Sequence, residues 1–221
     1  MVRADFDRSL NDLLNNLMAL GKMVEAAIIK SMAALQARDL QASFEVIHED
    51  KLVNEKRFEL EEQCIDLIAT QQPLAIDLRM LLSVLHIAVE LERMGDYAEG
   101  IGKVSLIVGE ESLLGAPPEL QEMADRGLDM LRRSLTAFVE RDTDAASQVW
   151  KDDDAVDTLY NGVVKELLLS MAHTPSLTER GTHLLWVAHD LERIADRATN
   201  IAERVIFLVT GKQKAPHWHL G

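Results

Sequence analysis

Carboxylates one helical turn apart occur twice in this chain of 221 residues, inside a segment that is repeated. The segment Glu90–Asp96 (ELERMGD) matches Asp190–Asp196 (DLERIAD) without a gap, at a shift of 100 residues. Such a match over a longer register indicates an internal duplication. Each copy places two acids on one face of a helix, Glu92 with Asp96 and Glu192 with Asp196. Paired side-chain oxygens of this kind are typical ligands of cations.

Further oxygen ligands extend these rows and recur in a second pair of segments. Glu99 continues the first row, and Asn200 and Glu203 continue the second. The segment 49–54 aligns with 152–157 at a shift of 103 residues, which adds Asp50 with Asn54 and Asp153 with Asp157. If the helices that carry these pairs pack antiparallel within each repeat, two pairs could face one ion or a small cluster.

Two interpretations of the acidic rows are open at this point. Like charges four residues apart on a helix repel each other, and a bridging cation would turn that repulsion into attraction. All-oxygen ligands suit hard or borderline metals, with magnesium and manganese among them. The second interpretation is a solvated face, in which Arg93 pairs with Asp96 and Arg193 with Asp196.

Other chemistry is weakly indicated. Glu45 and His48 form a single Glu-x-x-His, whereas di-iron oxidases of bundle type need two of them. His217 and His219 lie on a terminal segment, and the single cysteine, Cys64, has apolar neighbours. There is no glycine-rich phosphate loop and no nucleophile motif, so we predict that the protein is not an enzyme.

Charge and composition narrow the classes of partner. The net charge of −14 opposes nucleic acid and anionic lipid and suits cations or basic protein surfaces. The lone cysteine fits a reducing cytoplasm, and the acidic start does not resemble a signal peptide. The longest apolar stretches, at 84–89 and 205–209, are shorter than a membrane span, so direct membrane insertion is not expected.

The elements that must position these side chains are six long helices. Apolar spacing and caps predict helices at 5–37, 39–70, 74–108, 119–140, 142–171 and 177–210. The predicted caps are Asp39, either Asp142 or Thr143, and Ser176, and Gly211 is a predicted stop. One apolar stripe runs from Met80 to Val108 and another from Leu184 to Leu208. We therefore predict an all-α fold of two tandem three-helix bundles related by internal duplication. The repeats cover 1–110 and 111–211, and 212–221 is a loose C-terminal tail.

The duplicated motif resembles a known family. Leu91-Glu92-Arg93-x-x-Asp96 and Leu191-Glu192-Arg193-x-x-Asp196, with Ala198–Glu203 after the second, are similar to the signature of the PhoU family of bacterial phosphate-signalling regulators. The resemblance covers nearly the whole chain. It implies iron or zinc clusters held by Asp50, Glu92, Asp96, Asp153, Asp157, Glu192 and Asp196.

The resemblance also implies a function. Members are negative regulators of phosphate uptake and of the phosphate-starvation response. They act as non-enzymatic adaptors. They are thought to link the phosphate ABC transporter ATPase to a sensor histidine kinase, as cytoplasmic homodimers that are peripheral at the inner membrane through their partners. A plain helical interaction module without functional metal, and a di-iron oxidase, are the alternatives.

Two departures from the family pattern bear on the metal sites. Asn54 stands where the family has a second acid, which makes a neutral and weaker ligand in the first repeat. Glu99-Gly100 in the first repeat corresponds to Thr199-Asn200 in the second. We therefore expect the two sites to differ in occupancy.

Overall fold

The structure, a computed structural model, describes residues 2–109 and 117–212. It contains six long helices, preceded in one case by the 3-10 helix η1 (Pro175–Leu177). The helices are α1 (Val2–Ala37), α2 (Leu40–Gln71), α3 (Ile76–Val108), α4 (Glu119–Glu140), α5 (Thr143–His173) and α6 (Thr178–Thr210). This confirms the predicted all-α fold of six helices in two repeats. The tail histidines, His217 and His219, lie outside the described residues.

The structure has the predicted helix caps and the predicted stop, with one exception. The Asp39 carboxylate accepts from the Ala42 N–H, and the Asp142 carboxylate accepts from the backbone N–H groups that follow it. Gly211 ends α6 with a φ of 71°, a left-handed conformation that suits glycine. The prediction of Ser176 as a cap is wrong. Pro175 starts a 3-10 turn that contains Ser176, so α6 begins without a side-chain cap.

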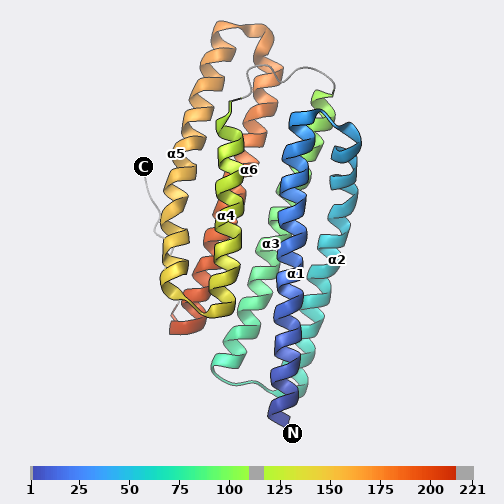
Figure 1. The fold of residues 1–221 in the computed structure, drawn as a ribbon, viewed down its shortest axis with the longest axis vertical. Coiled ribbons are helices and arrows are strands. Elements are labelled where there is room, and N and C mark those ends of the chain that lie inside the picture. Colours follow the sequence, from blue (N-terminus) through green and yellow to red (C-terminus); the bar gives the residue numbers. More distant parts are fainter. Residues whose placement is uncertain (1, 110–116, 213–221) are drawn as a thin grey trace.

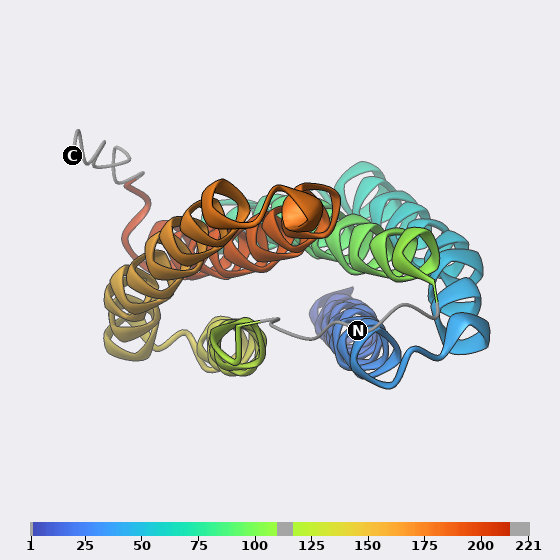
Figure 2. The ribbon, with the colours of Figure 1, turned by 90° about the horizontal axis from the view of Figure 1, so that it is seen from above.

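The two repeats lie side by side with their final helices at the centre (Figure 1). Seen from above, α5, α6, α3 and α2 form one layer, and α4 and α1 cover one face of it (Figure 2). In the central pair, Glu90 meets Asn200 and Gly100 meets Asp190, so α3 and α6 run antiparallel. Equivalent positions of the two repeats therefore face each other across a pseudo-two-fold axis.

The apolar stripes form the core. The α6 stripe from Leu184 to Leu208 is buried throughout, and the α3 stripe is buried except at Val108, which is half-buried. The buried apolar residues of both repeats belong to one continuous cluster. Full burial of a large apolar side chain contributes about 1.5–3 kcal/mol, so the shared cluster holds the repeats together. Among the described residues, no helix has the length and hydropathy of a membrane span.

Close helix contacts bring α2 onto α3. A Cβ at Gly95 would lie 3.1 Å from a Val53 methyl carbon and 3.2 Å from Asp50 Oδ1. A Cβ at Gly102 would lie 3.3 Å from the Ser43 carbonyl oxygen. The lack of side chains at these two glycines lets the helices approach, and this approach places Asp50 against α3.

Candidate functional site

In the first repeat, α2 and α3 bring the predicted ligands together. Asp50 and Asn54 come from α2, and Asn54 Nδ2 donates to Asp50 Oδ2 at 2.8 Å. The other carboxylate oxygen, Asp50 Oδ1, is buried and has no hydrogen-bond partner among the described residues. A buried carboxylate oxygen without a donor is energetically costly, and a cation would stabilise it.

Electrostatics show that the α3 acids face Asp50. Burial raises the pKa of Asp50 to about 6, and repulsion from Asp96, Glu99 and Glu92 contributes in that order. Burial and repulsion from Asp96 also raise the pKa of Glu92, and burial and repulsion from Glu99 raise that of Asp96. Lys103, which pairs with Glu99, opposes part of this repulsion. The first site therefore has excess negative charge in a partly buried place.

In the second repeat, α5 and α6 form the equivalent site, and the pKa values of two of its acids are raised further. Burial raises the pKa of Asp153 to about 7, with further repulsion from Asp196, Asp157 and Glu192. Burial likewise raises the pKa of Glu192 to about 7, and Asp196 adds repulsion. Glu192 Oε2 is buried and has no hydrogen-bond partner among the described residues. Asp153 and Glu192 are thus each repelled by Asp157 and Asp196.

Arginines distinguish the two sites. An Arg193 Nη atom lies 2.6 Å from a carboxylate oxygen of Asp196, and Arg197 lies 3.7 Å from the same oxygen. In the first repeat Arg93 instead pairs with Glu90 at 3.8 Å. The arginine–aspartate pairing expected for a solvated face is therefore present between Arg193 and Asp196. It is absent between Arg93 and Asp96, because Arg93 pairs with Glu90.

The three outlying candidates have different surroundings. Glu99 lies close enough to Asp50 and Asp96 to raise their pKa values. Asn200 is turned toward the other repeat, where its Nδ2 donates to Glu90 Oε2 at 3.0 Å. Glu203 is half-buried further along α6. As ligands, these three remain predictions.

The predicted ligands are of residue types that bind metals, but their side chains do not converge on one point. Among the described residues, no three histidine, cysteine or acidic side chains lie close enough together to hold one ion as they stand. Mutual repulsion favours such separation. Each acidic site nevertheless includes a buried carboxylate oxygen without a hydrogen bond, next to further acids on a neighbouring helix. Asp50, Glu92 and Asp96 would hold an ion in the first repeat, and the acids around Asp153 in the second.

The structure also reveals a polar contact between the repeats that was not predicted. Arg197 donates to Glu90 Oε2 at 3.1 Å, and both side chains are largely buried, with exposed fractions of 11% and 16%. At the pseudo-symmetric place, Asp190 faces Gly100, and burial raises the pKa of Asp190 to about 7. The one signal in the sequence is that the repeat breaks where Tyr97 corresponds to Arg197.

The Glu45–His48 motif does not lie in a bundle core. Glu45 pairs with Lys30 at 2.9 Å, and the exposed His48 ring stacks on Phe44. This position provides no support for a di-iron oxidase site.

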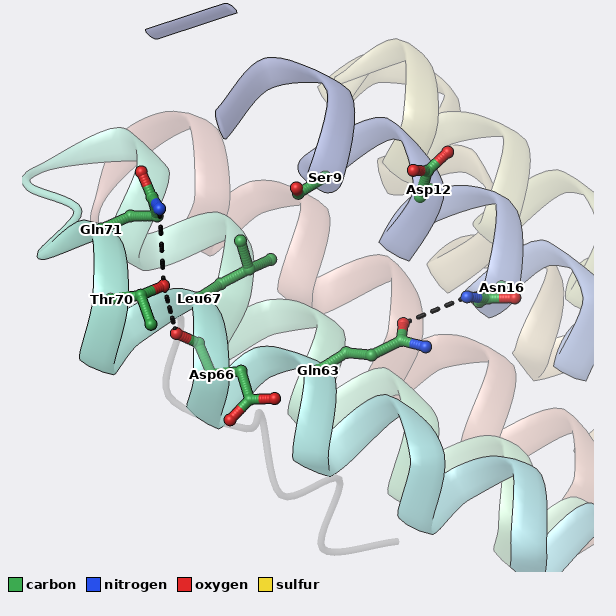
Figure 3. A pocket seen from close by; sticks show the side chains of 8 residues that line it. All are labelled: Ser9, Asp12, Asn16, Gln63, Asp66, Leu67, Thr70 and Gln71. Carbon is green, nitrogen blue, oxygen red and sulfur yellow. Dashed lines mark hydrogen bonds between the residues drawn. The ribbon is translucent and has the colours of Figure 1, made fainter. Parts of the chain in front are cut away.

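A separate polar groove of about 330 Å³ lies between α1 and α2 (Figure 3). Asn16 Nδ2 donates to Gln63 Oε1 at 3.1 Å across it. Its lining residues are Ser9, Asp12, Asn16, Gln63, Asp66, Leu67, Thr70 and Gln71. None of the predicted ligands lines this groove, so it is distinct from the acidic sites.

Comparison with known proteins agrees with the duplication and with the fold. The PhoU domain profile matches residues 17–104 and again residues 120–205. The chain is 38% identical to the phosphate-specific transport system accessory protein PhoU homolog of Clostridium acetobutylicum, over 96% of this chain and 98% of the relative. The corresponding homolog of Streptococcus pneumoniae is 32% identical, over 96% of this chain and 98% of the relative.

Solved structures agree over the same length. The crystal structure of PhoU from Pseudomonas aeruginosa matches with a TM-score of 0.87 and 32% identity, over 94% of this chain and all of that one. The structure of the phosphate transport system regulatory protein PhoU from Streptococcus pneumoniae matches with a TM-score of 0.85 and 30% identity, over 95% and 99% of the two chains. Together with the two profile matches, these similarities show that the chain belongs to the PhoU family.

Proposed function

We propose that this protein is a metal-binding accessory regulator of phosphate transport and phosphate homeostasis. Its relatives are named phosphate-specific transport system accessory proteins, and one solved relative is a phosphate transport system regulatory protein. The observation that carries the metal-binding part is a buried carboxylate oxygen without a hydrogen bond in each acidic site, at Asp50 and at Glu192, where the Glu192 oxygen lies 3.8 Å from His189 Nδ1. Both belong to acids whose pKa values are raised by burial and by neighbouring carboxylates.

The metal we propose is iron or zinc, with magnesium or manganese as alternatives. Oxygen donors accept all four ions, so the ligand set alone does not select among them. A bound cation supplies positive charge that offsets the repulsion among the acids. The carboxylates of this chain would bind and orient the ion, and Asn54 would add a neutral oxygen in the first repeat.

The regulatory part of the proposal is an adaptor role without catalysis. The protein would act as a cytoplasmic homodimer, peripheral at the inner membrane through its partners. It would link the phosphate transporter ATPase to the sensor histidine kinase and restrain the starvation response. The net charge of −14 supports contact with basic protein surfaces rather than with nucleic acid or anionic lipid.

Metal analysis tests the first part. Protein purified without chelator is expected to contain iron or zinc by mass spectrometry, and the double variant Asp96→Ala with Asp196→Ala is expected to contain less. Because both aspartates are partly exposed, the variant should stay folded, which circular dichroism checks. Unchanged metal content in the folded variant would exclude these ligands.

Partner capture tests the second part. The purified chain should retain the transporter ATPase and the kinase in a pull-down, and deletion of its gene should raise starvation-response output in phosphate-rich medium. No binding to either partner would refute the adaptor role.

One observation favours a plain interaction module instead, namely the pairing of Arg193 with Asp196. In that case a chelator should leave both the thermal stability and the partner binding unchanged.

A further inference from the structure

The outer side of α2 exposes large apolar side chains in a row. Phe44, Leu52, Phe58 and Ile65 are 45–57% exposed. At about 100° per residue, they fall within an arc of about 140°, opposite the buried Val46–Leu67 side of the same helix. We call these four residues the α2 face. In the described structure α2 packs on α1 and α3 and lies at the outer edge of its layer (Figure 2).

The duplication provides an internal comparison for this face. Five of the six buried positions of α2 recur as buried positions of α5 at a shift of 103 residues, so the two helices are equivalent. The outer positions differ in character, because Phe44, Leu52 and Phe58 correspond to Ser147, Ala155 and Asn161. Only Ile65 keeps a large apolar counterpart, Leu168. The outer positions of α5 show that this fold accepts small or polar residues at most of these places. The aromatic residues of α2 are therefore not required by the fold.

The two rings of the α2 face are held by neighbouring side chains. The His48 ring stacks on Phe44 with centroids 6.3 Å apart and planes 5° apart. The Arg57 guanidinium lies 3.9 Å from the centre of the Phe58 ring, and Glu61 accepts from Arg57 at 2.9 Å. Ordered aromatic side chains lose less conformational entropy on binding, which suits them as anchors for a partner.

The charge around the face indicates the chemistry of the partner. The α2 sequence carries eight acidic and three basic residues. Four acids lie within the arc of the face, Glu55, Glu59, Glu62 and Asp66, and the basic groups there are Lys51 and the Arg57 guanidinium on the Phe58 ring. This acidic border attracts a cationic segment, whereas it opposes anionic lipid and a second copy of a chain with net charge −14.

We propose that the α2 face docks a basic amphipathic helix of a partner protein. Apolar side chains of that helix would contact Phe44 and Phe58, and its lysines or arginines would meet Glu55 and Glu62. This inference rests on the proposed adaptor function and names the surface that would serve it. It concerns a different side of α2 from Asp50, which is directed toward α3.

A direct binding measurement tests the proposal with a synthetic leucine–lysine helical peptide that carries its leucines on one face. Fluorescence anisotropy at physiological ionic strength should show binding of the full chain to this peptide. Two matched peptides should bind weakly: one with the same composition but scattered leucines, and one with glutamate in place of lysine. Equal binding of the scattered peptide would mean charge attraction alone and would overturn the proposal.

Matched variants locate the binding surface. Phe44→Ser with Phe58→Asn installs the residues that α5 already carries at the equivalent positions, so the fold should be retained, as thermal melting checks. Two aromatic anchors lost together should weaken peptide binding by at least about tenfold. The control Leu168→Asn removes a similarly exposed apolar residue from α5 and should leave binding unchanged. Equal affinity of the double variant and the original chain would overturn the proposal.

The other occupants give distinct results. Loss of dimerisation in the double variant, with unchanged peptide binding, would assign the face to a second copy. Loss of binding to phosphatidylcholine–phosphatidylglycerol vesicles, again with unchanged peptide binding, would assign it to lipid. Because the peptide assay contains neither the transporter ATPase nor the kinase, failure to capture those proteins refutes the proposed function and leaves this result intact.

Discussion

Arg193 lies one turn from Asp196 on α6, and its guanidinium is 2.6 Å from the Asp196 carboxylate. The same arginine also hydrogen-bonds the Tyr97 hydroxyl on α3. A fixed cation of the protein therefore already neutralises one proposed ligand of the second site. The equivalent Arg93 pairs with Glu90, and it acts on Glu92 and Asp96 of the first site only by longer-range charge attraction.

Removal of this competitor should strengthen metal binding. Arg193→Ala should lower the zinc dissociation constant of the second site about 1.4- to fivefold, since partly exposed ion pairs contribute about 0.2–1 kcal/mol. Competition with a chelating indicator at pH 8 measures the effect above the pKa of Asp153 and Glu192. Arg93→Ala is the control and should change the first site by less than about twofold. Weaker zinc binding in Arg193→Ala would contradict a competing role.

The half-buried carboxyl of Asp190 should make the stability of the protein depend on pH. Its pKa in the folded protein is raised to about 7 from 3.8, so between these values the folded state holds a proton that the unfolded state releases. Its contribution to stability is therefore present at low pH and is lost as the pH rises to about 7. Asp190→Asn keeps the neutral shape and should stabilise the metal-free protein increasingly from pH 4 to 7, with no further gain above. Urea unfolding with chelator at several pH values measures this, and a gain independent of pH would contradict it.

At the pseudo-symmetric place the opposite result is expected. Glu90→Gln removes the charge that faces Arg197 and leaves a largely buried guanidinium with a weaker partner. The free energy of unfolding should fall by about 1–3 kcal/mol. Glu122→Gln is the matched control, because the Glu122–Arg126 pair is nearly half exposed on both sides and should change stability by less than about 0.5 kcal/mol. Equal effects of the two substitutions would show that burial at the repeat interface does not matter.

The two observed caps should contribute to the free energy of unfolding, and the wrongly predicted cap should not. Asp39→Ala and Asp142→Ala each remove an acceptor of backbone N–H groups and should destabilise the protein by about 1 kcal/mol. Ser176→Ala removes no cap of α6 and should lie within about 0.5 kcal/mol of the original. Chemical denaturation of the three variants gives the comparison, and a large loss in Ser176→Ala would restore its predicted role.

Local sequence signals were sufficient for most of the fold. The apolar stripes, the caps at Asp39 and Asp142 and the stop at Gly211 depend on residues within a few positions of one another, so they are visible before the chain folds. The duplication is visible for the same reason, since it compares the chain with itself. Ser176 failed because the proline before it favoured a 3-10 turn, which the cap rule does not consider.

The sequence by itself determined which side chains share a helical row, and the tertiary structure alone decided what each row faces. Each step of four residues turns about 40° beyond a full circle, so Asn200 is displaced by about 80° from Glu192. That rotation carries Asn200 out of the acidic row and onto Glu90 of the other repeat. The same packing buries Asp50 Oδ1 against Gly95 and places Asp190 beside Gly100. Burial and the proximity of charges arise only when helices pack together. The helical period of the sequence therefore cannot predict which carboxylates become desolvated.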